Sequence, residues 1–561
     1  MSKWKAKERG ERMEQQSAGV WNADGVIGGW QSGGESPHFD TEGIKSSISR
    51  IREPIHIVSG GPNGSRGLAF GGTIHHSSQM AQQGNYPLLS SLPAIYPEWL
   101  GDRSFLQTHG LRFPYVIGEM ANGIATTAMV IAAAKAGMLG FFGSAGLSPQ
   151  RVAQAIDELK AGLEPLGLPW GVNLIHSPSE TDREETNVDL YLERGVTRMS
   201  ASAFMSLTPS IVRYACSGLY LDENGRIVRQ NHVFAKISRP EIAKLFMSPA
   251  PEDMLLNLVR SGKLTAGEAR LASRIPLSED ITVESDSGGH TDNRPLGSLF
   301  STITALRDEL TALYRYDRPI RVGAAGGIGT PAAAAAAFAL GAAYIVTGTI
   351  NQASLESGLS DAGKQMLAKA DLADVTMAPS ADMFEMGVKV QVLKRGTMFS
   401  VRAHRLFEVY RQFDSLDSIP MDQRAKLEKE IFQDSLEHIW DETERFFQNR
   451  DPQQLVRAKK DAKHRMALVF RWYLGNASRW AIQGTAERRL DYQIWCGPAI
   501  GAFNAWTAGS FLEHPANRSV VQIALNIMEG AAVITRVHQL RTYGVAVVPE
   551  AFKISPRPMS V

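Results

Sequence analysis

The stretch from Ile281 to Pro295 combines residue types that could move a proton beside a flat ligand. Ile281-Thr-Val is typical of a short β-branched strand, and the strand is expected to stop at Ser287-Gly288-Gly289. Because glycine has no Cβ, this corner allows the backbone to approach something bulky. His290 follows directly, at the mouth of the predicted strand, and an imidazole that titrates near neutral pH can act as an acid or a base.

A second glycine-rich corner follows about thirty residues later, in the sequence R-V-G-A-A-G-G-I-G-T-P. Gly326-Gly327 can aim backbone N–H groups inward, and Thr330-Pro331 predicts an N-cap and the first residue of a helix. The positive end of that helix would face the loop, and Gly348-Thr349 after the next strand adds two more donors. We therefore expect the two corners to hold a flavin mononucleotide (FMN), with His290 beside its ring.

A dinucleotide-binding unit is the competing interpretation of the second corner, since Gly327-x-Gly329-x-x-Ala332 follows a strand. That fingerprint requires an acidic residue roughly twenty positions on. The next strand ends in Val346-Thr-Gly-Thr without one, so this alternative is the less favoured of the two.

Three polar residues at predicted strand ends each have two interpretations. Lys236 interrupts an apolar strand, either as a rim residue or as a cation that stabilises negative charge on a reduced flavin. Asn173 and Asn122 could bond the edge of a heteroaromatic ring, or could serve as ordinary strand-end residues.

Alternating strand and helix patterns predict the element that positions these residues. Between about residues 111 and 371 the chain fits eight β-then-α units, which predicts an α/β fold, a (β/α)8 or TIM barrel. The expected strands lie at residues 115–117, 137–143, 170–175, 198–203, 233–238, 281–284, 320–323 and 344–348. Two insertions are expected in it, a hairpin within Tyr214–Asn231 and a helical stretch within Pro251–Ile275.

The regions before and after the predicted barrel differ from it in composition and in the secondary structure that they predict. Residues 1–110 are rich in Gly, Ser, Pro and His and predict a small, irregular N-terminal region. Residues 372–561 predict a helical domain, beginning with one amphipathic helix over Met421–Phe447.

Composition excludes several classes of function. The net charge of +1 provides no global field for nucleic acid or membrane, and Cys216 and Cys496 form neither a CxxC pair nor a disulfide framework. A cytoplasmic location is expected, because the N-terminus lacks the apolar core of a secretory signal. The sequence also shows no spacing of His, Cys, Asp or Glu that is typical of a metal site.

One segment could be mistaken for a membrane span. Val322–Thr349 is uncharged and long enough to cross a bilayer, but its Gly and Ala residues and the break at Thr330-Pro331 favour a buried strand–loop–helix–strand.

Five motifs resemble one known group of proteins. The order of the barrel motifs resembles the FMN-dependent nitronate monooxygenases and flavin enoyl-ACP reductases. The chain resembles the PfaD family more closely than these, and PfaD is the trans-acting enoyl reductase of polyunsaturated-fatty-acid and polyketide synthases. The motifs that carry this resemblance are L-G-D-R-S-F-L-Q-T-H-G-L-R from Leu100, G-E-M-A-N-G-I-A from Gly118, A-K-I-S-R-P-E from Ala235, D-S-G-G-H-T-D-N-R-P from Asp286 and W-Y-L-G-N-A-S-R-W from Trp472.

The resemblance implies a reaction and a set of site residues. NADPH or NADH would reduce FMN, and hydride would pass to the β-carbon of a trans-2-enoyl thioester, while His290 either protonates the α-carbon or polarises the thioester carbonyl. Simpler relatives have Glu-Ala where this chain has Asp286-Ser287. The implied cofactor-binding residues are Met120, Asn122, Asn173, Lys236, Glu284, Gly289, Gly326, Gly327, Gly348 and Thr349.

The same resemblance implies an acyl carrier protein as partner and makes a homodimer unsurprising. Carriers are acidic, so the basic tract Arg457–Arg489 is either a docking face or a merely solvated helix surface. Two other functions stay open: a nitronate monooxygenase-like flavin oxidase on the same barrel, and a non-catalytic flavin-binding scaffold of a synthase.

Overall fold

The computed structural model describes residues 25–75, 85–176 and 181–560, and it divides into two compact units. One unit contains the chain up to Pro97 together with Glu529–Ile554, and the other contains Glu98–Met528 and Ser555–Val561. The barrel and the chain that follows it as far as Met528 therefore fall in the same unit, whereas Glu529–Ile554 belongs to the smaller one. The three-domain division with boundaries after residues 110 and 371 stays a prediction.

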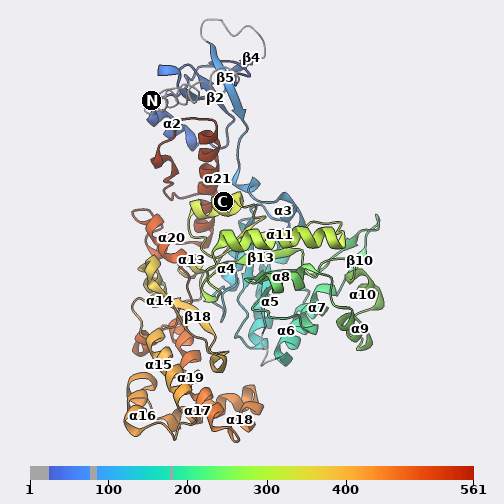
Figure 1. The fold of residues 1–561 in the computed structure, drawn as a ribbon, viewed down its shortest axis with the longest axis vertical. Helices are drawn as coiled ribbons and strands as arrows, with labels where there is room; N and C mark the ends of the chain where they lie inside the picture. The colour runs from blue at the N-terminus through green and yellow to red at the C-terminus, as the bar shows by residue number, and fades with distance from the viewer. Residues whose placement is uncertain (1–24, 76–84, 177–180, 561) are drawn as a thin grey trace, which may run out of the picture. The chain divides into compact units, whose positions relative to one another are not determined.

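A closed barrel of eight parallel strands forms the centre of the larger unit (Figure 1), in the order β12-β13-β15-β16-β6-β7-β8-β9. The predicted fold class is confirmed, and each predicted strand overlaps an observed one. The strands are β6 (Tyr115–Ile117), β7 (Leu139–Phe142), β8 (Gly171–Ile175), β9 (Arg198–Ser202), β12 (His232–Ile237), β13 (Asp280–Glu284), β15 (Arg321–Ala325) and β16 (Ile345–Thr347).

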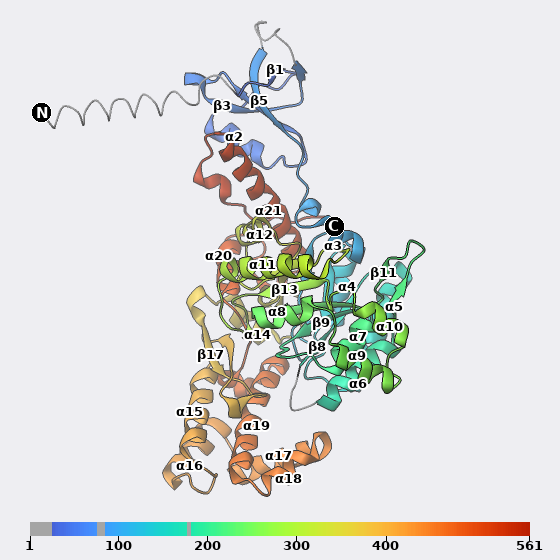
Figure 2. The ribbon, with the colours of Figure 1, turned by 45° about the vertical axis from the view of Figure 1, so that its right-hand side comes forward.

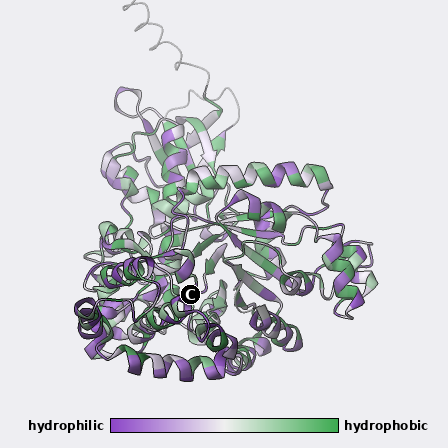
Figure 3. Ribbon diagram, turned by 60° about the horizontal axis from the view of Figure 1, so that its bottom comes forward, coloured by the Kyte–Doolittle hydropathy of each residue, from purple (hydrophilic) through white to green (hydrophobic). Residues whose placement is uncertain are grey.

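Helices follow the strands and surround them. Figure 3 shows mostly hydrophobic strands at the centre of this unit and helices of mixed character around them, as burial on both faces of a parallel sheet requires. The helices are α4 (Thr127–Lys135), α5 (Pro149–Leu163), α6 (Thr181–Glu193), α7 (Pro209–Cys216), α8 (Pro240–Met247), α11 (Leu296–Tyr314), α12 (Pro331–Ala339), α13 (Thr349–Gln352) and α14 (Asp361–Ala368).

Both predicted insertions are present. A hairpin of β10 (Tyr220–Leu221) and β11 (Ile227–Val228) precedes β12, and helices α9 (Glu252–Arg260) and α10 (Ala266–Ala272) precede β13. The uncharged stretch Val322–Thr349 forms parts of β15, α12 and β16, so its assignment to a buried strand–loop–helix–strand is confirmed.

The smaller unit corrects the prediction of an irregular N-terminal region. It contains a five-stranded antiparallel sheet in the order β3-β2-β5-β1-β4 around buried Trp30, Val58 and Leu88. The sheet depends on pairing between distant segments, which no local periodicity reveals. Its elements are β1 (Gly28–Gln31), α2 (Thr41–Ile48), β2 (Ile55–Ser59), β3 (Arg66–Phe70), β4 (Thr73–His75) and β5 (Asn85–Leu92).

Helix α21 (Val520–Thr542) contributes residues to both units, because the division falls at Met528. Among the described residues it is the one helix long and apolar enough to cross a membrane by length and composition, and 89% of its most apolar window is buried within the protein. It therefore resembles the core helix of a folded protein.

The segment after the barrel is mainly helical, as predicted (Figure 2), but it also has two strands, β17 and β18, which form a three-stranded sheet with β14 from the barrel loop after β13, in the order β14-β18-β17. The strands are β14 (Gly289–His290), β17 (Val375–Pro379) and β18 (Lys389–Leu393). The helices are α15 (Phe399–Gln412), α16 (Met421–Leu427), α17 (Leu436–Arg450), α18 (Pro452–Ala458), α19 (Ala462–Gln483) and α20 (Ala499–Thr507).

The single helix predicted over Met421–Phe447 is wrong. The chain ends α16, makes a π-helical turn, and reaches Gln433 at φ 57°, a left-handed conformation that ends a helix. Ser435 then accepts a hydrogen bond from the N–H of His438 and begins α17 as its N-cap. The apolar spacing is continuous across this break because both helices pack on the same core.

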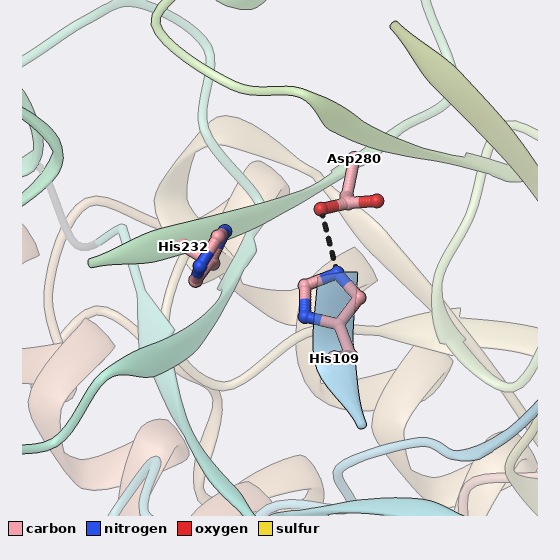
Figure 4. A group of neighbouring side chains, drawn as sticks. All are labelled: His109, His232 and Asp280. Carbon is pink, nitrogen blue, oxygen red and sulfur yellow. Dashed lines mark hydrogen bonds and ion pairs between the residues drawn. The ribbon is translucent and has the colours of Figure 1, made fainter. Parts of the chain in front are cut away.

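A buried charged cluster lies at the amino ends of the barrel strands (Figure 4). Asp280, the first residue of β13, accepts hydrogen bonds from Arg321 Nε at 2.6 Å and Nη2 at 2.8 Å, and His109 Nε2 lies 3.0 Å from its Oδ2. Burial would raise the pKa of Asp280, but His109 and Arg321 hold it far below its usual range. Arg198 in turn donates to His109 Nδ1 at 3.4 Å.

The same cluster has the composition of a metal site, since ligand atoms of His109, His232 and Asp280 all lie within 4.8 Å of one another. The neighbouring groups oppose that function. Both oxygens of Asp280 already accept from Arg321, and a second guanidinium, from Arg198, contacts His109. The arrangement is that of a structural ion pair closing the amino end of the barrel.

We expect Asp280→Asn to lower the free energy of unfolding by about 3–5 kcal/mol, because it removes the main counter-charge of the buried Arg321 guanidinium and leaves only the more distant Glu279 at 3.9 Å. Chemical denaturation followed by circular dichroism measures this. The control is Asp308→Asn, which removes a carboxylate that is 69% exposed and should change stability by about 0.5 kcal/mol or less. Equal effects of the two substitutions would contradict the structural role of the cluster.

Candidate functional site

A cavity of about 1070 Å³ opens at the carboxyl ends of the barrel strands, where this fold carries its chemistry. All of the residues singled out from the sequence line it, although their individual roles stay predictions. They are Met120, Asn122, Asn173, Lys236, Glu284, Gly289, His290, Gly326, Gly327, Gly348 and Thr349.

A lysine that lies between two carboxylates lines the cavity. Lys236 Nζ, on β12, lies 2.9 Å from Glu119 Oε1 and 3.1 Å from Glu284 Oε1 at the end of β13. Burial would lower the pKa of Lys236, but the two carboxylates raise it above its usual range, and Lys236 in turn holds the pKa of Glu119 below its ordinary value against the effect of burial. Lys236 and Glu119 are therefore both charged at neutral pH.

Glu119 is a residue to which the sequence analysis gave no role. It stands two residues after the end of β6, and Ser202 at the end of β9 donates a hydrogen bond of 2.6 Å to the oxygen that Lys236 contacts. An acidic residue just past the end of a buried barrel strand was the signal available for it.

Asn173 and Asn122 both have clear structural tasks at the edge of the cavity. The side chain of Asn173 is nearly fully buried, and its Nδ2 donates to Ser200 O and Ser202 Oγ, each at 3.0 Å. Asn122 has a φ of 57°, which asparagine tolerates better than most residues, and its N–H donates to Ala145 O at 2.7 Å. These contacts hold the strand ends in place; contact with a ligand through the remaining side-chain atoms stays a prediction.

The second glycine corner has the geometry of an anion site. Gly326 and Gly327 have φ values of 84° and 68°, and Thr330 accepts a hydrogen bond from Ala333 N as the N-cap of α12. Within the described residues, the N–H groups of Gly327 and Gly348 have no hydrogen-bond partner. Unpaired donors beside a helix N-terminus are suited to phosphate.

His290 lies on a strand that does not belong to the barrel. Gly289 and His290 form β14, which pairs antiparallel with β18 through Gly289↔Gln391 and His290↔Val390. Gly289 has a φ of 83°, so the chain turns sharply there. The imidazole is therefore held at the cavity by the segment that follows the barrel.

The expectation that both glycines before His290 make room for a ligand requires correction. A Cβ on Gly288 would lie 2.8 Å from the backbone of Cys496, so this glycine allows two parts of the chain to approach each other. A Cβ on Gly289 would have open space within 4 Å. Only the second glycine leaves room on the cavity side.

A polar network braces the loop that carries His290. Gln391 Nε2 donates to Asp286 Oδ1 and to Ser287 O, both at 2.7 Å, and Asn293 Nδ2 donates to the same carboxylate oxygen at 2.9 Å. Asp286 is thus used to fix the backbone of the loop. The carboxylate of Asp286, which stands where simpler relatives have Glu, therefore has a structural role in this chain.

A carboxylate and a hydroxyl group contact the imidazole of His290 from the segment after β17. Asp382 Oδ1 lies 3.4 Å from His290 Nε2, Ser380 Oγ lies 3.3 Å from it, and Ser380 also donates to Asp382. Burial lowers the pKa of His290, but the hydrogen bond and charge of Asp382, helped by Glu284, raise it above its ordinary value. The pKa of Asp382 itself falls to about 2, with His290 as the main stabilising partner against burial.

The imidazole is consequently suited to carry a proton. Asp382 and Ser380 occupy Nε2, and within the described residues Nδ1 has no partner. An ion pair to Nε2 favours the imidazolium form, whose Nδ1–H remains able to donate to a bound molecule. Neither Asp382 nor Ser380 was singled out from the sequence, because nothing near them in the chain resembles a catalytic motif.

Comparison with known proteins gives two family matches. Residues 104–408 match the family model described as nitronate monooxygenase. Residues 413–492 match that of the inserted helical domain of [acyl-carrier-protein] S-malonyltransferase.

Individual relatives belong to two kinds of biosynthetic complex. The chain is 49% identical to one of the polyunsaturated fatty acid synthase subunits of a Thraustochytrium species, over 79% of this chain and 30% of that protein. It is 45% identical to the polyketide biosynthesis protein PksE of Bacillus subtilis, over 78% of this chain and 57% of that protein. It thus spans about a third to somewhat over half the length of these curated relatives, and the resemblance to PfaD is confirmed.

One solved structure is similar along its whole length. The enoyl reductase domain of MlnA, from the macrolactin biosynthesis cluster of Bacillus amyloliquefaciens, superposes with a TM-score of 0.76 at 38% identity. The match covers 79% of this chain and 99% of that domain.

We expect Asp382→Asn to lower the pKa of His290, because it removes the negative charge that favours the imidazolium. Histidine ring resonances followed by NMR over pH 5–9 measure this, with the His290 signal identified by its loss in His290→Gln. The control is Asp292→Asn, which also removes a carboxylate at the cavity, but one that is bonded to Arg239 at 2.9 Å. An unchanged His290 titration in Asp382→Asn would show that the ion pair does not set its protonation.

Proposed function

The chain belongs to the nitronate monooxygenase family, and we propose that it is an FMN-dependent enoyl reductase. The substrate would be a trans-2-enoyl thioester on an acyl carrier protein, reduced at the expense of NADPH or NADH. The observation that carries the proposal is the pairing of His290 with Asp382 over the barrel cavity, which provides a proton donor where a reduced double bond must receive one. Similarity to the MlnA enoyl reductase domain supports it.

The residues present fit FMN. The unpaired N–H groups of Gly327 and Gly348, with the N-terminus of α12, would hold its phosphate. Lys236 would stabilise negative charge on the ring, and the two carboxylates that contact it keep it ionised. When bound, FMN would supply hydride transfer from the nicotinamide to the β-carbon of the enoyl thioester.

The protein itself would provide the proton that reduction of the double bond requires. Reduction of the double bond adds hydride to the β-carbon and a proton to the α-carbon, so an acid must stand on the substrate side. His290 can donate from Nδ1 while Asp382 holds Nε2 and stabilises the charged ring. Activity should therefore be highest below the raised pKa of His290 and fall as the pH rises through it.

An acyl carrier protein is the partner that the relatives and the helical segment of this chain support best. The relatives are proteins of fatty acid and polyketide synthesis. Residues 413–492, within the segment that follows the barrel, resemble a helical domain from an enzyme that acts on acyl carrier protein. The helical segment would thus receive the carrier, and a homodimer in the cytoplasm remains an expectation.

We expect the purified protein to be yellow and to release FMN on heating. Gly327→Ala should weaken FMN binding about 5- to 30-fold, since a Cβ at its φ of 68° costs about 1–2 kcal/mol in the conformation that presents its N–H. Fluorescence titration of the apoprotein measures the dissociation constant. The control is Gly225→Ala, whose φ is 72° in the β10–β11 turn and whose Cβ would also meet open space. Colourless protein that binds no FMN would refute the proposed cofactor.

We expect His290→Ala to lower kcat/KM for a crotonyl thioester by about 10²–10⁴-fold while FMN binding stays intact, the usual range for a lost general acid. Stopped-flow reoxidation of the reduced flavin without oxygen measures the step directly. Unchanged rates in this variant would favour a non-catalytic flavin-binding scaffold.

The nitronate monooxygenase match supports one rival function, a flavin oxidase of nitroalkanes. The two functions differ in which molecule reoxidises the flavin. Under anaerobic conditions an enoyl thioester should do so here, and a nitroalkane should fail to transfer electrons to the oxidised protein. The reverse pattern would establish the oxidase.

A further inference from the structure

We propose that the outer part of the cavity, between α17 and α19, binds the phosphodiester of the arm on which a carrier protein holds its thioester, with Arg479 as the principal contact. This inference rests on the proposed function and names the part of the substrate that the helical segment recognises. The cavity does not end at the barrel mouth: its lining continues along both helices. We call this outer part the arginine channel, and the proposal takes it as the route by which a thioester reaches His290.

The arginine channel carries a concentrated positive charge. The residues that α17 and α19 contribute to its lining include four arginines, Arg445, Arg450, Arg471 and Arg479, and a single acidic residue, Glu442. Glu442 accepts a hydrogen bond of 3.0 Å from the indole nitrogen of Trp472, which fixes its position. Because the net charge of the whole chain is only +1, this excess is local and suits an anionic ligand.

Three of the four arginines make contacts within the protein. Arg471 lies 3.5 Å from a carboxylate oxygen of Glu385, Arg445 donates to Asp441 O at 3.3 Å, and the Arg450 guanidinium lies over the ring of Phe446. Arg479 differs from them. It is exposed, and within the described part of the chain its guanidinium has no hydrogen bond or ion pair. A planar guanidinium with free donors is the side chain best suited to bind a phosphate oxygen pair.

Apolar side chains separate the arginines and suit the rest of such an arm. Phe446 is 44% exposed, and Phe447, Trp472 and Ile482 also line the channel. The combination fits a ligand with an anionic end and a long, weakly polar chain that leads inward to the thioester.

The arm of a carrier protein is favoured here over the phosphates of the nicotinamide nucleotide. The channel is built from α17 and α19, which lie within the segment on which the carrier proposal depends. A nucleotide ligand remains a distinct outcome of the test, because its affinity can be measured separately.

The test compares substrates with and without the phosphodiester. In Arg479→Ala we expect KM for a crotonyl-carrier substrate to rise about tenfold with little change in kcat, because the contact is remote from the reacting atoms. The crotonyl thioester of N-acetylcysteamine, which has no phosphate, should be reduced with unchanged kcat/KM. Arg479→Glu should raise KM for the carrier substrate further, and Arg479→Lys should retain part of the binding.

Arg318→Ala is the matched control, since Arg318 is exposed, lies outside residues 413–492 and does not line the cavity. It should leave both substrates unaffected. Fluorescence anisotropy adds a readout that does not require turnover: wild-type protein should bind the carrier bearing its arm more tightly than the carrier without it, and Arg479→Ala should abolish the difference.

Three results would overturn the inference. These are an equal effect of Arg479→Ala on both thioesters, a rise in KM for NADPH instead of the carrier substrate, and equal binding of the two carrier forms by the wild-type protein. Failure of the wild-type protein to reduce either thioester would instead refute the proposed function, and the anisotropy comparison would still decide the role of Arg479.

Discussion

The pairing of β14 with β18 is the contact on which the functional geometry depends. It consists of two residue pairs, Gly289↔Gln391 and His290↔Val390, yet it joins a loop of the barrel to the segment that follows the barrel. Through it, Asp382 and Ser380 reach the imidazole, and Gln391 reaches Asp286 below it. Without this pairing His290 would be an ordinary loop histidine near its unperturbed pKa; with it, the ring is oriented and its charged form is stabilised.

The two ends of the barrel show how position along a strand decides what a buried charge does. At the amino ends, both carboxylate oxygens of Asp280 are already contacted by Arg321 or His109, so neither is free to bind a ligand. At the carboxyl ends, Lys236 is also held between carboxylates, but it lines an open cavity and faces a space where a ligand can bind. Ion pairing between buried charges therefore stabilises the fold at the amino end of the barrel, and at the carboxyl end it keeps a lysine charged beside the cavity.

Local sequence patterns predicted most of the barrel and the lining of its cavity. Apolar runs that end in Gly, Asn or Lys located the eight strands, and a strand end in this fold points to the cavity, so residues such as Lys236 and Gly327 were placed correctly. Glu119 could have been found by the same rule. What the patterns missed depends on distant pairing: the N-terminal sheet, the strand β14, and the contact of Asp382 with His290. The break after α16 was missed for another reason, because one left-handed residue, Gln433, interrupts a helix without disturbing its apolar spacing.

The central claim is that a protonated imidazole, fixed from outside the barrel, faces a flavin held by Gly327 and Gly348, the glycines that follow β15 and β16. A crystal structure of the purified holoprotein tests this most directly. The account predicts the FMN phosphate at the N–H groups of Gly327 and Gly348, and His290 Nδ1 facing the space above the ring, with Asp382 on Nε2. A flavin bound elsewhere, or an imidazole turned away from the ring with no contact to Asp382, would contradict it.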